Sequence, residues 1–185
     1  MIGLEKGRVR LAPHDAEWEA EAERTVAELR ALLGDAAVDI QHVGSTSVPT
    51  IMAKPIIDIA VSAADFSSVL KHESVLRERG YYYRPGAELE NQLLFAKGSY
   101  YDGSGEMQTH FIHVVGRDSR EWRDYINFRD YLIRHPEIAK QYEALKISLW
   151  QKAPVDQDRE KYLAGKESFI TSILAEARAF FGNRR

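Results

Sequence analysis

The stretch "IQHVGSTSVPTIMAKPIIDIAV" at residues 40–61 decides both the fold and the candidate site. It begins with an alternating segment typical of a strand, passes through a turn of glycine and small hydroxyl residues, and ends in a second apolar segment. That segment is rich in β-branched residues, which is typical of a strand buried inside a sheet. We therefore expect residues 56–62 to form a central strand, with Asp58 on one face and Ile57 and Ile59 buried on the other.

Periodic apolar residues elsewhere predict the remaining helices and strands. Helical spacing runs over residues 15–33 and again over residues 65–80. After Val115 the pattern is helical, and the last helix is expected from about Asp156 to Phe181. Further strands are predicted at residues 37–43, 81–85, 91–98 and 107–115, the last two forming an antiparallel hairpin.

This order of elements predicts an α+β fold, in which a mixed β-sheet core is followed by a helical C-terminal half. Regular alternation of strand and helix is missing, which argues against a dinucleotide-binding sheet. We expect one domain over residues 1–185, with the sheet core at about 1–116. The helical part, at about 117–185, should cover one face of the sheet.

Composition narrows the class of protein. The chain has no cysteine, which excludes disulfides, thiolate zinc sites and a cysteine nucleophile. Its net charge of −3 argues against duplex nucleic acid as a partner. No apolar run approaches the ~18 residues of a membrane helix, and the charged start "MIGLEKGRVRLAPHD" is unlike a secretion leader. We therefore expect a cytoplasmic protein without a membrane partner.

The turn formed by Gly44, Ser45, Thr46 and Ser47 is a candidate anion site. A glycine lets the backbone approach a ligand closely, and the hydroxyl groups add donors that phosphate accepts. Lys54, shortly before the second strand, is a candidate cation for the same phosphate. The Walker spacing is absent, and an ordinary tight turn with a solvated loop lysine remains an alternative interpretation.

Asp58 is a candidate metal ligand and catalytic residue. A lone acid in so apolar a strand needs a partner or a metal, because burying it alone is costly. Nucleotidyltransferases combine a Gly-Ser turn for the triphosphate with acids on neighbouring strands that bind divalent cations. The second acid is usually two positions further along the strand, where this chain has Ala60. A two-metal mechanism therefore lacks one expected carboxylate.

His110 and His113 in "THFIHVV" are the next candidates. Their positions differ by an odd number, so on a regular strand they face opposite sides of the sheet. At most one of them should point toward Asp58 unless a bulge intervenes. That histidine could bind metal, donate to phosphate or act as a base. A half-buried structural histidine is the alternative for each.

Several blocks together resemble the GrpB family, namely "IQHVGSTSVP", "AKPIIDIAV", "THFIHVV" and "FRDYLIRHPEIAKQYEALK". The similarity extends from "LAPHDAEW" to "YLAGKESFI". This bacterial family is assigned to the nucleotidyltransferase superfamily fold and is sometimes fused to dephospho-CoA kinase. The resemblance implies a nucleotidyltransferase-like core with a helical C-terminal part. Thr50 departs from the glycine that the family's loop more often carries.

We expect a protein that binds a nucleotide or another small phosphorylated ligand. If it is an enzyme, the expected reaction is Mg²⁺-dependent nucleotidyl transfer. One alternative is a binding or accessory module that has lost the second metal carboxylate. Another is a metal-assisted phosphohydrolase. The predicted catalytic residues are Asp58 and His113, with Mg²⁺ on Asp58, and the predicted ligand-binding residues are Gly44, Ser45, Thr46, Ser47, Lys54 and His110.

Overall fold

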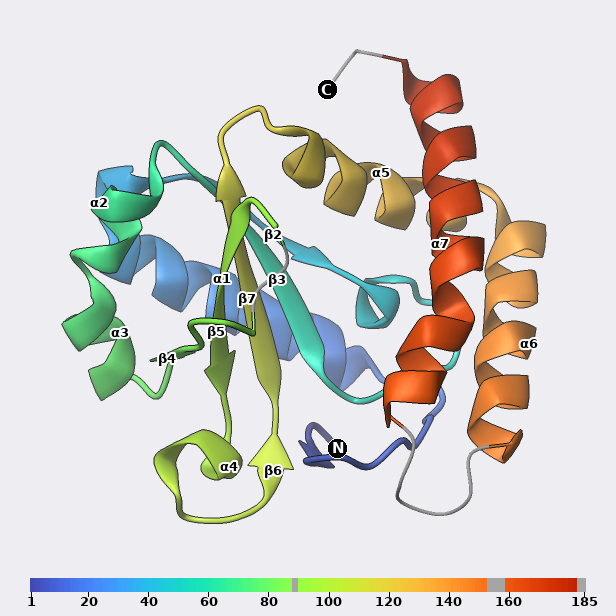
Figure 1. Ribbon diagram of the computed structural model, residues 1–185, viewed down its shortest axis with the longest axis horizontal. Coiled ribbons are helices and arrows are strands. Elements are labelled where there is room, and N and C mark those ends of the chain that lie inside the picture. The colour runs from blue at the N-terminus through green and yellow to red at the C-terminus, as the bar shows by residue number, and fades with distance from the viewer. Residues whose placement is uncertain (88–89, 153–158, 183–185) are drawn as a thin grey trace.

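A computed structural model describes residues 1–87, 90–152 and 159–182. Its centre is a five-stranded mixed sheet in the order β2-β3-β7-β5-β4 (Figure 1). β3 runs antiparallel to β2 and parallel to β7, and β5 runs antiparallel to β7. The strands are β2 Ala37–Val43, β3 Ile57–Ala63, β4 Tyr82–Tyr83, β5 Gln92–Lys97 and β7 His110–Gly116, and a separate pair joins β1 Leu4–Glu5 to β6 Met107–Gln108.

The prediction of a central strand in the quoted stretch is confirmed by β3, which lies between β2 and β7. Ile57, Ile59 and Val61 are fully buried, and Asp58 is partly exposed. Paired neighbours on both sides satisfy the backbone of β3, and its β-branched side chains fill the space between sheet and helix. The predicted β5–β7 hairpin is also confirmed, although its connection contains a short helix, α4 Ser99–Asp102.

Helix α1, Ala16–Leu33, covers the apolar face of the sheet. It begins where the Asp15 side chain accepts a hydrogen bond from the Glu17 backbone N–H, at 3.0 Å. Trp18 and Leu29 are buried in one continuous core with the strand side chains. The sequence therefore predicted this helix correctly.

The helix predicted over residues 65–80 is divided into α2 Phe66–Leu70 and α3 Glu73–Glu78. The division occurs at His72, whose ring nitrogen Nδ1 lies 2.9 Å from the Ser68 carbonyl oxygen. The His72 backbone N–H donates instead to the Val69 carbonyl. The regular i→i−4 hydrogen bonding of the helix is therefore interrupted at this point.

The C-terminal half consists of α5 Arg120–Arg134, α6 Pro136–Lys152 and α7 Arg159–Phe181. We expected this half to cover one face of the sheet, and α5 does so by packing on β2, β3 and β7. α6 and α7 pack on α5 and stand beside the sheet (Figure 1). The predicted start of the last helix near Asp156 lies outside the described residues. No helix among the described ranges is long and apolar enough to cross a membrane.

Candidate functional site

The end of β2 and the start of β3 bring Gly44 against Asp58. Strand pairing places Val43 opposite Asp58, and the chain then leaves the sheet at Gly44 with φ of 73°. A Cβ atom at position 44 would lie 2.6 Å from the Asp58 Oδ2 atom. Both the positive φ and this contact require glycine, so the turn fixes the carboxylate against the backbone.

The three hydroxyl groups of the turn point in different directions. The Ser47 hydroxyl donates to the Gly44 carbonyl at 2.6 Å, which closes the turn. The buried Thr46 hydroxyl donates to the Ile56 carbonyl at 3.4 Å and lies beside the following strand. Ser45 and Thr46 line the cavity next to Asp58, and Ser47 lines a different hollow beside α1. Of the predicted hydroxyl donors, Ser45 is therefore the best placed to meet a ligand.

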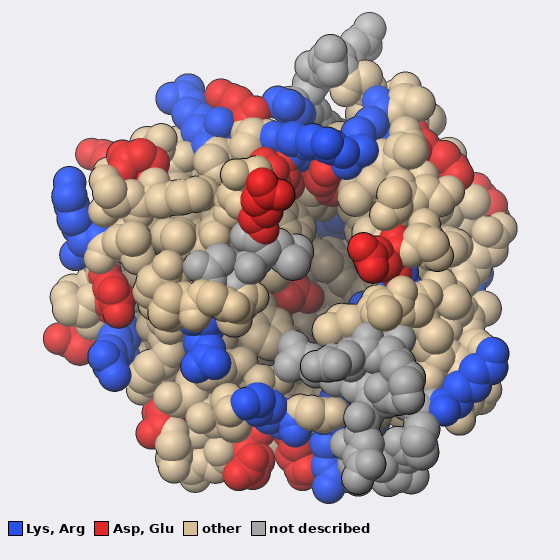
Figure 2. All heavy atoms as spheres, viewed as in Figure 1, with Lys and Arg blue, Asp and Glu red and all other residues tan. Residues whose placement is uncertain are grey.

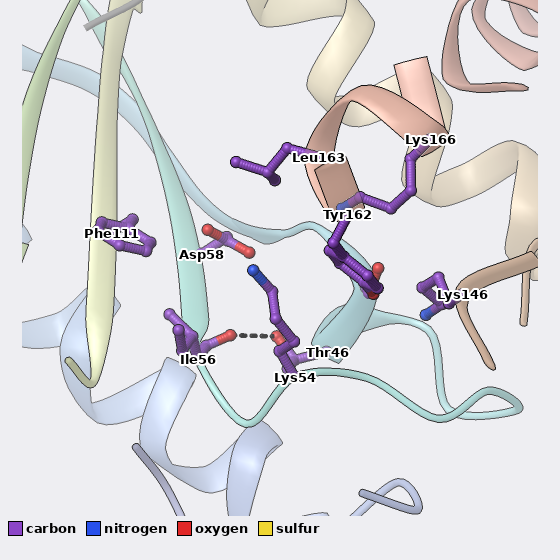
Figure 3. A pocket seen from close by; sticks show the side chains of 10 residues that line it. Thr46, Lys54, Ile56, Asp58, Phe111, Lys146, Tyr162, Leu163 and Lys166 are labelled. Carbon is purple, nitrogen blue, oxygen red and sulfur yellow. Dashed lines mark hydrogen bonds between the residues drawn. The ribbon is translucent and has the colours of Figure 1, made fainter. Parts of the chain in front are cut away.

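A cavity of about 210 Å³ lies between this turn and the two C-terminal helices. Three lysines meet in it: Lys54 from the loop before β3, Lys146 from α6 and Lys166 from α7. Figure 3 shows Lys54 pointing toward Asp58, with Tyr162 and Lys166 approaching from α7. The cavity is lined by Ser45, Thr46, Lys54, Ile56, Asp58, Phe111, Lys146, Tyr162, Leu163 and Lys166.

The Tyr162 ring lies between two of these lysines. The Lys54 Nζ atom is 5.4 Å from the ring centroid, and the Lys166 Nζ atom is 4.8 Å from it. Tyr162 itself is 2% exposed, so its ring is fixed in the wall of the cavity. These cation–π contacts hold the two ammonium groups near the same aromatic ring.

Lys146 is unusual because it is a buried lysine, 2% exposed. Its Nζ atom donates to the Met52 carbonyl and lies 4.6 Å from the Tyr142 ring centroid. Burial lowers the pKa of Lys146 to about 7, and the charges of Lys166 and Lys54 lower it further, while Glu143 opposes them. The three lysines therefore repel one another in a poorly solvated space.

A second, larger lobe of about 610 Å³ adjoins this cavity and shares Ser45, Asp58 and Lys166 with it. Figure 2 shows a hollow in the viewed face, with acidic side chains around its opening. Asp58 thus stands where the two lobes meet. The walls that belong to the larger lobe include the aromatic residues Tyr125, Phe128 and Tyr142 and the acids Glu90, Glu121 and Asp124.

His113 is the histidine that reaches Asp58. Its Nε2 atom is 3.4 Å from the Asp58 Oδ1 atom, and its ring packs on Tyr125 with centroids 5.0 Å apart. Its Nδ1 atom is buried and has no hydrogen-bond partner among the described residues. This contact between the imidazole and the carboxylate holds Asp58 at the edge of the cleft.

His110 lies on the opposite face of the same strand, as the odd spacing predicted. Its Nε2 atom is 3.2 Å from both the Thr25 hydroxyl and the Glu21 Oε1 atom on α1. It is 3% exposed, and burial lowers its pKa to about 4. The structure therefore brings His113, and not His110, to Asp58, and it separates His110 from the other predicted ligand-binding residues.

The residues around Asp58 do not fit a two-metal centre. Ala60, where strand periodicity would place a second acid, is fully buried against Val43 and Ile126 of α5. In the part of the chain that the structure describes, no three His, Asp or Glu side chains are grouped as metal ligands. Asp58 and His113 are one carboxylate and one imidazole, whereas Mg²⁺ prefers several oxygen ligands. We therefore derive no chemistry from a pair of bound ions.

Lys146 and Lys166 were not predicted from the sequence. They lie far from the Gly-Ser turn along the chain, in segments whose pattern indicates only helices. One signal was available, since Lys146 continues the buried stripe of Ala139 and Tyr142 on α6. A lysine on an apolar helix stripe is costly to bury, so such a residue can mark a site.

Comparisons with known proteins agree on the family and the fold. The family model described as GrpB protein matches residues 8–176. The glutamate-rich protein GrpB of Alkalihalophilus pseudofirmus is 36% identical over 95% of this chain and 99% of its own length. A dephospho-CoA kinase of Mycolicibacterium paratuberculosis is 28% identical over 94% of this chain, which spans only 47% of that protein.

Solved structures extend the comparison. The crystal structure of the conserved protein GrpB from Enterococcus faecalis superposes with a TM-score of 0.83 at 29% identity, covering 93% of this chain and 99% of the other. A Cid1 poly(U) polymerase structure superposes with a TM-score of 0.50 at 13% identity, over 77% of this chain and 44% of the polymerase. The fold is therefore nucleotidyltransferase-like.

Proposed function

Because the chain belongs to the GrpB family and has a nucleotidyltransferase-like fold, we propose that it binds a nucleotide or another phosphorylated small molecule in the two-lobed cleft beside Asp58. The observation that carries this proposal is the convergence of Lys54, Lys146 and Lys166 on the cavity that Ser45 lines. Three ammonium groups beside a hydroxyl and a close-approaching backbone form an environment suited to phosphate oxygens.

The larger lobe supports a ligand with more than a phosphate group. The partly exposed rings of Tyr125 and Phe128 offer surfaces on which a planar ring can pack, whereas Tyr142 is buried and stacked on Phe169. The matched Cid1 structure is described as bound to MgGTP, which makes nucleotides the first ligands to test here. We place the phosphates among the lysines and the remainder of the ligand in the larger lobe.

A second candidate is catalysis of nucleotidyl transfer, which the contact between His113 and Asp58 at the meeting point of the lobes favours. Asp58 would take a proton from an acceptor hydroxyl in the larger lobe. The acceptor oxygen would then bond to the α-phosphorus as pyrophosphate leaves, and the lysines would stabilise that leaving group. With water as the acceptor, the same arrangement would give hydrolysis.

Calorimetric titration with ATP, GTP, CTP and UTP tests the binding proposal. We expect at least one nucleotide to bind, and Gly44→Ala to weaken it because the new Cβ displaces Asp58 and clashes at a positive φ. Gly86→Ala is the matched control, since Gly86 also has a positive φ but has open space around it. The proposal fails if no nucleotide binds, or if both variants bind as tightly as the wild type.

A product assay separates the catalytic candidate from a pure binding module. Nucleoside triphosphates labelled at the α-phosphate would be incubated with the protein and a mixture of small metabolites as acceptors. A labelled adduct indicates transfer, and labelled nucleoside monophosphate indicates hydrolysis. Either product should disappear in Asp58→Asn, because the amide cannot accept the proton. Turnover that survives in this variant would assign the chemistry to other residues.

A further inference from the structure

The ligand set around Asp58 is poor in the oxygen donors that divalent cations need. The position of a second acid is filled by Ala60, which α5 covers. A carboxylate there would have to displace Val43 or Ile126 to reach an ion. The partner that Asp58 does have is the His113 imidazole, which is a poor ligand for Mg²⁺.

The same site is rich in ammonium groups. Lys54, Lys146 and Lys166 come from three separate segments and line one small cavity. Among its described lining residues, Asp58 is the one acid, so the ammonium groups outnumber the carboxylates. Cation–π contacts to Tyr162 fix the positions of Lys54 and Lys166 before any ligand binds.

The burial of Lys146 also favours an anionic ligand in this cavity. Its ammonium group is out of reach of bulk water, and its hydrogen-bond partner is the neutral carbonyl of Met52. Neighbouring positive charges oppose its protonation, as its lowered pKa indicates. Burying the Lys146 charge is costly by itself, whereas a polyanion in the cavity would stabilise the charged form of Lys146.

We propose that the cluster of Lys54, Lys146 and Lys166 takes the place of the divalent cations, so that the site binds the polyphosphate group of its ligand in metal-free form. This inference rests on the proposed phosphate-binding function and goes further by naming the ionic species that is bound. The lysines donate hydrogen bonds to the phosphate oxygens and neutralise them, which is the role that Mg²⁺ has in binding polyphosphates elsewhere.

Inorganic tripolyphosphate is the probe, because it carries the charge without a base or an acceptor group. It would be titrated calorimetrically at pH 7, first in EDTA and then with excess Mg²⁺. We expect binding in EDTA to be as tight as, or tighter than, binding with Mg²⁺, because the metal neutralises the ligand and competes with the lysines. ATP titrated under both conditions would test the proposed function in parallel.

Lysine variants assign the binding to this cavity. Lys54→Met and Lys166→Met should each weaken tripolyphosphate binding in EDTA by about tenfold or more, the value of one charge-assisted hydrogen bond. Lys71→Met removes the same charge from an exposed position between α2 and α3 and should change affinity little. Lys166→Arg, which keeps the charge, covers the case in which Lys166→Met does not fold, and it should retain most of the affinity.

The outcomes separate the two proposals. Binding that needs Mg²⁺ overturns the metal-free inference and leaves the proposed function standing. Absence of binding by both tripolyphosphate and ATP, with and without Mg²⁺, overturns both. Tight binding in EDTA that Lys54→Met and Lys166→Met leave unchanged also overturns the inference, because the anion then lies outside this cavity.

Discussion

The two faces of the central sheet differ in what their side chains form: one face is packed into an apolar core, and the other lines the cleft. On the face covered by α1, Trp18, Leu29 and Ile59 belong to one continuous apolar core. On the other face, α5 buries only a small patch around Ala60. The remainder of that face opens into the cleft, where Asp58 and the lysines of α6 and α7 meet.

This difference shows that alternate residues of one strand can serve the core on one face and the candidate site on the other. In β3 the buried Ile57 and Ile59 alternate with Asp58, and in β7 His110 and His113 point to opposite faces. His110 is tied to α1 by polar contacts, whereas His113 contacts Asp58 at the cleft. If this comparison is right, substitutions on the α1 face should change stability alone, and those in the cleft should affect ligand binding.

Trp18→Ala is the largest expected effect and tests the packed face. Trp18 is fully buried between α1 and the sheet, so its truncation removes a large apolar contact and leaves a cavity. The free energy of unfolding should fall by about 3–5 kcal/mol, as measured by urea denaturation. Under conditions in which the variant is folded, tripolyphosphate affinity should match the wild type, and a specific loss of binding would contradict the separation of the two faces.

Ala60→Asp tests the small apolar patch under α5, which lies next to the cleft. A carboxylate there would be buried against Val43 and Ile126, with Gln41 and His113 as its neighbours in the strand register, and the cost of burying it should lower the free energy of unfolding by about 2 kcal/mol. Val38→Asp, at a position 46% exposed on the edge strand β2, should lose no more than about 1 kcal/mol. Chemical denaturation measures both. A stable Ala60→Asp variant that gains Mg²⁺ affinity would show instead that position 60 belongs to the cleft.

Lys146→Met is the smallest expected change in stability and has the opposite sign. Replacing a buried ammonium with an apolar side chain should raise the free energy of unfolding by about 1–2 kcal/mol at pH 6, while tripolyphosphate binding weakens. Because the pKa of Lys146 is lowered to about 7 from 10.5, the unfolded wild type binds more protons between these pH values. Wild-type stability attributable to Lys146 therefore rises over that range, and the advantage of the variant should shrink by pH 9.

Thermal and urea unfolding at pH 6 and pH 9 would check this prediction, with Lys152→Met, an exposed lysine on the same helix, as the control. The control should stay within about 0.5 kcal/mol of the wild type at both pH values. A Lys146→Met variant that is less stable than the wild type at pH 6 would mean that its hydrogen bond to Met52 outweighs the cost of the buried charge.

The amino-acid sequence by itself determined the strands of the central sheet, helix α1 and the position of the turn at Gly44, but not β1 or the division of residues 107–115 into β6 and β7. Those features are local, because alternation in β3 and helical spacing in α1 follow directly from which side chains must be buried. Strand parity also predicted that His110 and His113 would face opposite ways. It could not say which of them would face Asp58, since that depends on which face α1 covers.

The tertiary structure alone decided which lysines line the smaller cavity beside Asp58. Lys146 and Lys166 line the same cavity as Ser45 because α6 and α7 fold back beside the sheet (Figure 1). No local pattern encodes this arrangement, since it joins segments that are distant in the chain. Packing of α5 likewise decided that Ala60 is covered and not open. Periodicity fixes which side of an element is apolar, but the element that packs against that side, and the charges it brings, depend on the long-range contacts of the folded chain.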